Sequence, residues 1–369
     1  MAIIDLSAVR ANAQEARRLA AGRQVIAVVK ADAYGHGAVA VARVLLDAGC
    51  ERLAVVSVQE AAELRQGGID APILLLWGVR SRAEAEAAVT LRLTPVLHHG
   101  ESLALSAAAA AAAGARLPVH VEVDTGMRRM GVPPEEASSF LAEVAGREAL
   151  ELEGVFTHFA CADAPDLSHC RTQAAQFREV LAGARRLGVK PALVHAANSA
   201  ALMAGEPLSE ALPEANAVRP GLMLYGVHPA PHLAAELRPA MTLRAPVVCL
   251  RRVSGGESVG YGATFRAGSP GTRVATLPLG YADGISWSAG NRGRVWLAGA
   301  RRPIVGRVSM DSITVDVGDA RVSVGDEAVV FGNPDEGGLS AEEAAEDAAT
   351  IAYELLVRVG RRVPREIVG

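Results

Sequence analysis

The chain places a lysine, Lys30, where it could do covalent chemistry. Five apolar residues, Val25–Val29, precede it, and the sequence Tyr-Gly-His-Gly follows at 34–37. The apolar run predicts a buried strand, with Lys30 at its carboxyl end. A lysine held there and partly desolvated can lose its proton and attack a carbonyl carbon, which is how lysine holds pyridoxal phosphate as a Schiff base. The alternative is a plain surface lysine, and the rest of the chain decides between the two.

Further polar residues lie at the ends of later apolar runs. They are Glu122 at the end of the fifth run and Arg129 beyond it, His158 after the sixth, Asn198 and Ser199 after the seventh, and Arg219 in the eighth. Each has an ordinary alternative, such as a core histidine, a helix N-cap or a surface arginine. In a (β/α)8 enzyme, however, the carboxyl ends of the strands form the active site. Ser199, with backbone N–H groups near Gly221 and Leu222, would suit a phosphate there.

Glu122 lies within an apolar strand, so its carboxylate demands a cationic partner. Arg129 is the predicted partner, through a charge-assisted hydrogen bond that would fix the arginine in place. The alternative is that Glu122 pairs with Arg128 or with a lysine on the solvent side and has no part in catalysis.

The elements that position these residues alternate between strand and helix. Such alternation, repeated eight times, predicts a parallel (β/α)8 TIM-type barrel over residues 8–232. The second choice is a doubly wound open sheet, but no GxGxxG follows the first strand. Strands are expected at Val25–Val29, Leu53–Ser57, Pro72–Leu76, Leu93–Leu97, Val119–Val123, Leu152–Thr157, Ala192–His195 and Val218–Leu224. Helices are expected at Val39–Ala48, Val58–Gln66, Arg82–Val89, Pro134–Ala145 and Gln173–Leu187, and an alanine-rich one is expected to be capped by Ser106 and ended by Gly114.

The pattern changes in the last third of the chain, where short alternating stretches are separated by turn residues. This predicts a mainly-β domain over residues 233–369, to which residues 1–7 are expected to add a strand. One helix, roughly Ser340–Ala349, is expected there because Ser340 and Glu343 form a capping-box pattern.

Composition limits the class of protein. The chain has 369 residues, is half apolar and carries a net charge of −4, which argues against a nucleic-acid partner. The four cysteines show no metal-binding spacing, so no metal is expected. No signal peptide and no membrane span is recognisable, and we expect a cytoplasmic protein without a membrane partner.

Motifs along nearly the whole chain resemble those of alanine racemases, enzymes of fold-type III that use pyridoxal 5'-phosphate. The resemblance is strongest in the sequence AVVKADAYGHG at 27–37. It continues in order through DTGMRRMG at 124–131, THFA at 157–160, ANS at 197–199, VRPGLMLYG at 218–226, VGYGAT at 259–264, LGYADG at 279–284, GRVSMD at 306–311 and TIAYE at 350–354. It implies a homodimer that interconverts L-alanine and D-alanine and supplies D-alanine for peptidoglycan.

The resemblance implies a role for each matched residue. Lys30 carries the cofactor and acts as the base on one face of the substrate, while Tyr261 of the other subunit acts on the opposite face. Arg219 contacts the pyridine nitrogen, and His158 links it toward Tyr261. The phosphate cradle is formed by Tyr34, Ser199, Gly221, Leu222 and Tyr353, and Asn198 also contacts the cofactor. The substrate carboxylate is bound by Arg129 and by the backbone N–H of Met310 from the other subunit, and the site is supported by Glu122, Tyr281 and Asp311.

Elementary chemistry agrees with these roles. Racemisation removes a proton from one face of Cα and returns it to the other, which favours two bases. Arginine keeps its proton, so a pyridine nitrogen beside Arg219 would stay unprotonated, whereas a carboxylate there would suit a decarboxylase better.

The chain departs from the usual pattern of the family at a few positions. Glu122 stands where many relatives have a lysine that becomes carbamylated, position 128 is an arginine rather than a small residue, and Ser309 replaces a frequent cysteine. The alternatives left open are a pyridoxal-phosphate decarboxylase or aldolase built on a barrel, a racemase of broad specificity, and a cofactor-binding protein without catalysis.

Overall fold

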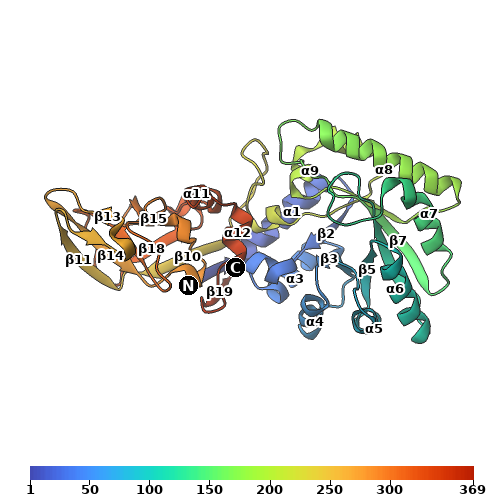
Figure 1. Cartoon of the computed structure of the whole chain (residues 1–369), viewed down its shortest axis with the longest axis horizontal. Coiled ribbons are helices and arrows are strands. Elements are labelled where there is room, and N and C mark those ends of the chain that lie inside the picture. Colours follow the sequence, from blue (N-terminus) through green and yellow to red (C-terminus); the bar gives the residue numbers. More distant parts are fainter.

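Eight parallel strands close into a barrel in the computed structural model, which describes all residues 1–369. Pairing of Val25 with Val218 joins the first barrel strand to the last, so the predicted barrel is confirmed and an open sheet is excluded. Figure 1 shows the barrel and the C-terminal domain side by side along the long axis, with both termini near their junction. The barrel strands are β2 (Gln24–Val28), β3 (Arg52–Val55), β4 (Ile73–Leu75), β5 (Leu93–Leu97), β6 (Leu117–Glu122), β7 (Leu150–Phe156), β8 (Leu193–His195) and β9 (Ala217–Val218).

Helices surround the barrel, and several begin where local sequence requires it. Ser57 and Glu60 form a capping box at the start of α4, and Pro134 occupies the first position of α7. The helices and the short 3-10 turn of this region are α1 (Leu6–Ala20), α2 (Lys30–Gly35), α3 (Ala38–Asp47), α4 (Val58–Gln66), α5 (Arg82–Thr90), α6 (Gly100–Ala112), α7 (Pro134–Ala145), α8 (Ser168–Arg186), α9 (Ser199–Ala204), α10 (Glu206–Ser209) and η1 (Leu222–Tyr225).

Two local predictions were wrong. Helix α6 begins at Gly100, capped by His99, so Ser106 lies buried inside the helix rather than at its start. The eighth strand ends at Val218 and does not reach Leu224, because Pro220 lacks an N–H for a ladder and the chain then turns into η1.

The C-terminal domain is built from three small sheets. The largest has the strand order β16-β15-β18-β10-β1-β19, and the other two are β11-β14-β17 and β12-β13. Their strands are β1 (Ala2–Asp5), β10 (Met241–Pro246), β11 (Cys249–Ser254), β12 (Ser258–Val259), β13 (Phe265–Arg266), β14 (Gly271–Leu277), β15 (Arg294–Leu297), β16 (Ala300–Pro303), β17 (Ile313–Asp316), β18 (Glu327–Phe331) and β19 (Arg365–Val368). Between them lie η2 (Tyr261–Ala263), η3 (Tyr281–Asp283), η4 (Trp287–Ala289), η5 (Pro334–Glu336), α11 (Ala341–Asp347) and α12 (Ala352–Val357).

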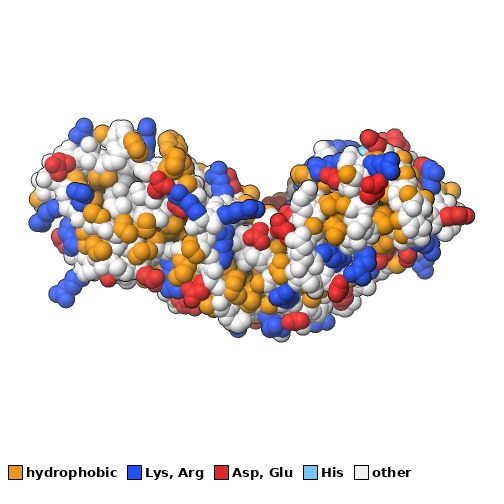
Figure 2. All heavy atoms as spheres, turned by 90° about the horizontal axis from the view of Figure 1, so that it is seen from below, with side chains coloured by type: hydrophobic (Ala, Val, Ile, Leu, Met, Phe, Trp, Pro, Cys, Tyr) orange, Lys and Arg blue, Asp and Glu red, His pale blue; other side chains and the backbone are white.

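The two parts of the molecule are tied together at the chain's amino terminus. Strand β1 lies between β10 and β19 of the C-terminal sheet, and α1 follows it directly toward the barrel. A continuous apolar core runs through both parts, and Figure 2 shows two lobes with a concave face between them. The domain boundary between 232 and 233 stays a prediction. None of the helices is both long and apolar enough to cross a membrane.

Candidate active site

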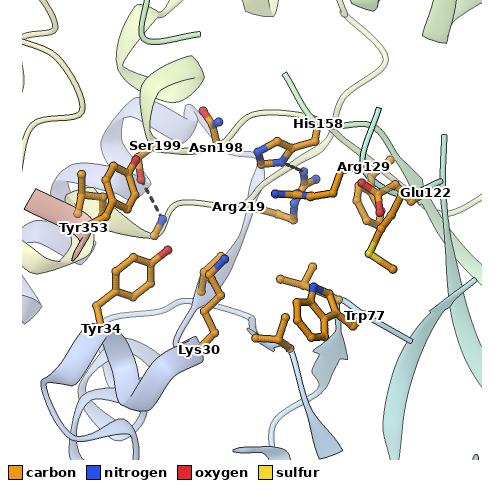
Figure 3. A pocket seen from close by; sticks show the side chains of 17 residues that line it. Lys30, Tyr34, Trp77, Glu122, Arg129, His158, Asn198, Ser199, Arg219 and Tyr353 are labelled. Atoms are coloured by element: carbon orange, nitrogen blue, oxygen red, sulfur yellow. Dashed lines mark hydrogen bonds between the residues drawn. The ribbon is translucent and has the colours of Figure 1, made fainter. Parts of the chain in front are cut away.

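A cavity of about 180 Å³ opens at the carboxyl ends of the barrel strands. Figure 3 shows its labelled side chains converging from the ends of several strands. The predicted residues that line it are Lys30, Tyr34, Glu122, Arg129, His158, Asn198, Ser199, Arg219, Gly221, Leu222 and Tyr353. The structure thus brings together residues that are more than 300 positions apart in the sequence.

Lys30 stands where β2 ends and a left-handed turn begins. Residues Ala31–Tyr34 all have φ between 52 and 54°, a conformation that costs roughly 1–2 kcal/mol for each non-glycine residue. Two carboxylates hold this turn, because Glu60 accepts the N–H of Ala31 at 2.8 Å and Asp32 accepts that of Ala38 at 2.7 Å. Strain retained in this way is typical of functional sites.

The charged ammonium form of Lys30 is less stable here than in water. Burial lowers its pKa, and the nearby guanidinium of Arg129 lowers it further, while Glu60 opposes the shift. A lysine whose pKa is lowered spends more time as a free amine, which is the nucleophilic and basic form.

Ser199 and its neighbours form a polar corner of the cavity. The Ser199 hydroxyl oxygen accepts the N–H of Gly221 at 2.9 Å and that of Met223 at 3.3 Å, so its own proton remains to be donated. Leu222 is the first residue of η1, and its N–H has no partner inside that turn. The N–H of Gly221, by contrast, already donates to Ser199 and is not free for a phosphate, contrary to expectation.

Gly221 also allows Tyr34 to approach. A Cβ at position 221 would lie 2.7 Å from the Tyr34 hydroxyl oxygen, a separation that side chains do not tolerate. Tyr353 of α12 lies near Tyr34, with ring centroids 6.2 Å apart. Asn198 is the N-cap of α9, as its alternative role predicted, because its side chain accepts the N–H of Ala201 at 2.9 Å. Together these hydroxyl and N–H groups can hold a phosphate.

Arg219 is buried at the cavity, and both of its terminal nitrogens donate hydrogen bonds. One terminal nitrogen donates to Nδ1 of His195, and the other donates to the Thr157 carbonyl at 2.9 Å and to Nδ1 of His158 at 3.3 Å. Its Nε–H makes no hydrogen bond within the protein, and Arg219 lines the cavity, where this N–H can meet an acceptor. Burial lowers the Arg219 pKa to about 10, so the guanidinium stays charged at neutral pH.

His158 is neutral, because burial and the charge of Arg219 lower its pKa to about 3. Arg219 donates to Nδ1, so the proton of the neutral ring lies on Nε2. His158 therefore offers a hydrogen-bond donor from Nε2.

The predicted pairing of Glu122 with Arg129 was wrong. The buried carboxylate of Glu122 lies 3.2 Å from Nδ1 of His98, whereas Arg129 forms no ion pair and is exposed at the rim of the cavity. The alternative partner, Arg128, faces Asp124 at 3.8 Å. His98 directly follows β5, which pairs with β6, so the strand order alone could have identified it. Sequence reasoning likewise missed Trp77 and Phe156 in the cavity wall.

The predicted residues of the C-terminal domain lie elsewhere. Tyr261, Met310 and Tyr281 are 71%, 52% and 46% exposed, and none of them lines the cavity of their own chain. Asp311 is paired with Arg362 at 2.7 Å. The structure of one chain does not bring this group to the barrel residues.

Comparison with known proteins gives consistent matches along the whole chain. The family model for the alanine racemase N-terminal domain matches residues 4–229, and that for the C-terminal domain matches residues 240–367. The alanine racemase of Carboxydothermus hydrogenoformans is 42% identical over 98% of this chain and 97% of its own length. The solved alanine racemase of Streptomyces coelicolor superposes with a TM-score of 0.94 at 38% identity, covering 100% of this chain and 97% of the other. That of Streptomyces lavendulae gives 0.93 at 39% identity, covering 100% and 96%.

Proposed function

This chain belongs to the alanine racemase family, and from that premise we propose that it interconverts L-alanine and D-alanine with pyridoxal phosphate bound in the barrel cavity. The observation that carries the proposal is the pairing, in one cavity, of a lysine with a lowered pKa and a buried arginine.

The residues of the cavity fit pyridoxal phosphate. The hydroxyl of Ser199, the N–H of Leu222 and the phenols of Tyr34 and Tyr353 would hold its phosphate. The Nε–H of Arg219 would meet the pyridine nitrogen, and Lys30 would hold the aldehyde carbon. When bound, the cofactor supplies an electron sink for the negative charge left on the substrate Cα.

Two bases would share the proton transfer. Lys30, with its lowered pKa, would take or return the proton on one face of Cα. Tyr261 would act on the other face. We propose that this tyrosine comes from a second copy of the chain, because Tyr261 is exposed and does not line the cavity of its own chain. His158 can donate from Nε2 to that tyrosine oxygen, which would favour its basic form.

The substrate carboxylate would be held by the exposed guanidinium of Arg129 at the rim and by the backbone N–H of Met310 from the partner copy. Tyr281 would line the entrance, and Asp311 would support the loop through Arg362. Glu122 would support the wall of the cavity through His98 rather than through Arg129.

Arg219 distinguishes this function from decarboxylation. A guanidinium keeps its proton and leaves the pyridine nitrogen unprotonated, which weakens the electron sink and limits side reactions. The product, D-alanine, would serve the synthesis of peptidoglycan, and the enzyme would be a cytoplasmic homodimer.

The direct test is to incubate the purified protein and pyridoxal phosphate with L-alanine and to follow optical rotation and released carbon dioxide. We expect the rotation to fall to zero without carbon dioxide. Carbon dioxide release would support a decarboxylase, and unchanged rotation despite bound cofactor would contradict racemisation. A panel of L-serine, L-lysine and L-alanine should show preference for alanine.

A further inference from the structure

A chain of polar side chains crosses the barrel interior beneath Arg219. Arg219 donates to Nδ1 of His195, and Nε2 of His195 lies 2.9 Å from Nδ1 of His120. Nε2 of His120 lies 3.2 Å from the carboxylate of Glu153. The same carboxylate receives two bonds from Arg52, at 2.7 and 2.9 Å. Since Arg52 is the first residue of β3, this chain extends from the cavity toward the opposite end of the barrel.

The two ends of the chain fix the position of every proton in it. Arg219 can only donate, so Nδ1 of His195 accepts and its Nε2 carries the proton. That proton is donated to Nδ1 of His120, which places the second proton on Nε2 of His120. Glu153, an ionised carboxylate held by Arg52, can only accept it. Both histidines are thus neutral Nε2–H tautomers, and all the bonds point from Arg219 to Glu153.

The barrel interior contains these hydrogen-bonded side chains despite the free-energy cost of burying polar groups. Barrel interiors are usually filled by branched apolar side chains, and buried polar groups destabilise unless they are hydrogen-bonded. Both nitrogens of both rings have partners here, and the two histidines are completely buried. Burial also lowers the pKa of His120 and of His195, in keeping with neutral rings.

The absence of a side chain at Gly154 leaves space for the His120 ring. His120 faces Gly154 across β6 and β7, and a Cβ at position 154 would lie 2.5 to 2.7 Å from three atoms of the His120 ring. Two residues further along β7, the Phe156 ring stacks on His195 at 4.8 Å between centroids and lies under the guanidinium of Arg219 at 4.4 Å. Strand β7 therefore packs against both rings, with Gly154 against His120 and Phe156 against His195.

We propose that Glu153 is a positioning residue for Arg219, which it holds through the fixed tautomers of His120 and His195. The inference rests on the proposed function for its catalytic meaning, since Arg219 would contact the cofactor. Without the Glu153 acceptor, the direction of the hydrogen bonds through His120 and His195 can reverse. His120 would then carry its proton on Nδ1, His195 would carry its own on Nδ1, and that N–H would oppose the guanidinium of Arg219.

The test compares four forms of the protein labelled with 15N-histidine: the parent, Glu153→Ala, Glu153→Gln and Arg52→Met. Two-bond 1H–15N correlations report which ring nitrogen carries the proton. We expect Nε2–H tautomers for His120 and His195 in the parent. Glu153→Gln and Arg52→Met both remove the ion pair between Arg52 and Glu153. Each keeps an oxygen at position 153 that can accept the proton of His120, so both should retain these tautomers. Glu153→Ala should lose them. Should Glu153→Ala fail to fold, the double variant Arg52→Met, Glu153→Ala removes the unpaired cation and takes its place.

The second measurement is the affinity for pyridoxal phosphate, followed by titration of its absorbance. Glu153→Ala should weaken it about tenfold, the usual size of one charge-assisted hydrogen bond, and Glu153→Gln should restore it. Unchanged tautomers and affinity in Glu153→Ala, or Nδ1–H tautomers in the parent, would overturn the proposal. The tautomers are read without any turnover, so failure to racemise alanine would contradict the proposed function alone and leave the positioning role supported.

Discussion

The barrel cavity and the exposed face of the C-terminal domain use their side chains in opposite ways. In the cavity, Lys30, His158 and Arg219 are largely buried and their pKa values are all lowered. On the C-terminal domain, Tyr261 and Met310 point into solvent. One region is an assembled set of buried groups whose pKa values are lowered, and the other is a set of exposed side chains that do not line that cavity. This difference is what the proposed shared site requires, in which the barrel cavity of one copy is completed by Tyr261 and Met310 of a second copy.

The largest effect should follow from removing the lysine of the cavity half. The chain contains only two lysines, Lys30 and the exposed Lys190. Lys30→Ala should lower racemisation by roughly 10⁴-fold, the upper range for one proton-transfer group. It should also abolish covalent retention of the cofactor after borohydride reduction. The control, Lys190→Ala, should behave as the parent. If the cofactor is retained on Lys190 with full activity, Lys30 has been assigned wrongly.

The next largest effect should come from the C-terminal half and should depend on direction. Tyr261→Phe removes one hydroxyl, and we expect a loss of roughly 10²–10⁴-fold in racemisation. In deuterated water, exchange at Cα should continue for D-alanine, which uses Lys30, and nearly cease for L-alanine. Tyr281→Phe provides the control, because it removes a second exposed phenol that takes no proton. Equal exchange into both enantiomers would refute the division of faces.

How far the sequence predicted this arrangement depended on the range of the interactions involved. Elements with local signals, such as α4 with its capping box and α7 with its first proline, were predicted to the residue. The strand ends placed the cavity residues correctly because parallel strands of a barrel share one face. The partner of Glu122 was missed because it depends on which strand lies beside β6. Nor does the sequence of one chain place Tyr261, whose proposed partners belong to another copy.

The two halves should also differ in their response to acid. All nine histidines precede residue 233, so any effect of histidine titration arises in the barrel half. Burial lowers the pKa of His158 to about 3 and that of His36 to about 4. The unfolded chain binds these protons near pH 6.5, so the free energy of unfolding should fall as the pH drops below that value. His158 alone should contribute about 2 kcal/mol of this loss at pH 5.

The measurement is the free energy of unfolding of the cofactor-free protein by urea between pH 7 and pH 5, for the parent and for His158→Gln. The variant should lose less stability over this range. Parallel curves would show that His158 does not stay neutral in the fold.

The smallest effect concerns the wall of the cavity. Glu122→Gln leaves a group of the same shape beside His98 and removes a charge, so we expect a loss of about 1 kcal/mol in the free energy of unfolding. The KM for alanine should rise by less than about tenfold, because Arg129 does not depend on Glu122. Bicarbonate should change neither value. A large rise in KM that only Glu122→Lys with bicarbonate reverses would restore the direct pairing with Arg129.

The most direct test of the shared site mixes two inactive variants, Lys30→Ala and Tyr261→Ala. In a hybrid dimer, one site lacks both groups and the other keeps Lys30 of one copy and Tyr261 of the other. Random exchange should therefore restore about a quarter of the parental activity. Subunit exchange is followed independently with differently tagged copies. Recovery at that level would confirm that the two halves meet across the dimer, and no recovery despite proven exchange would contradict it.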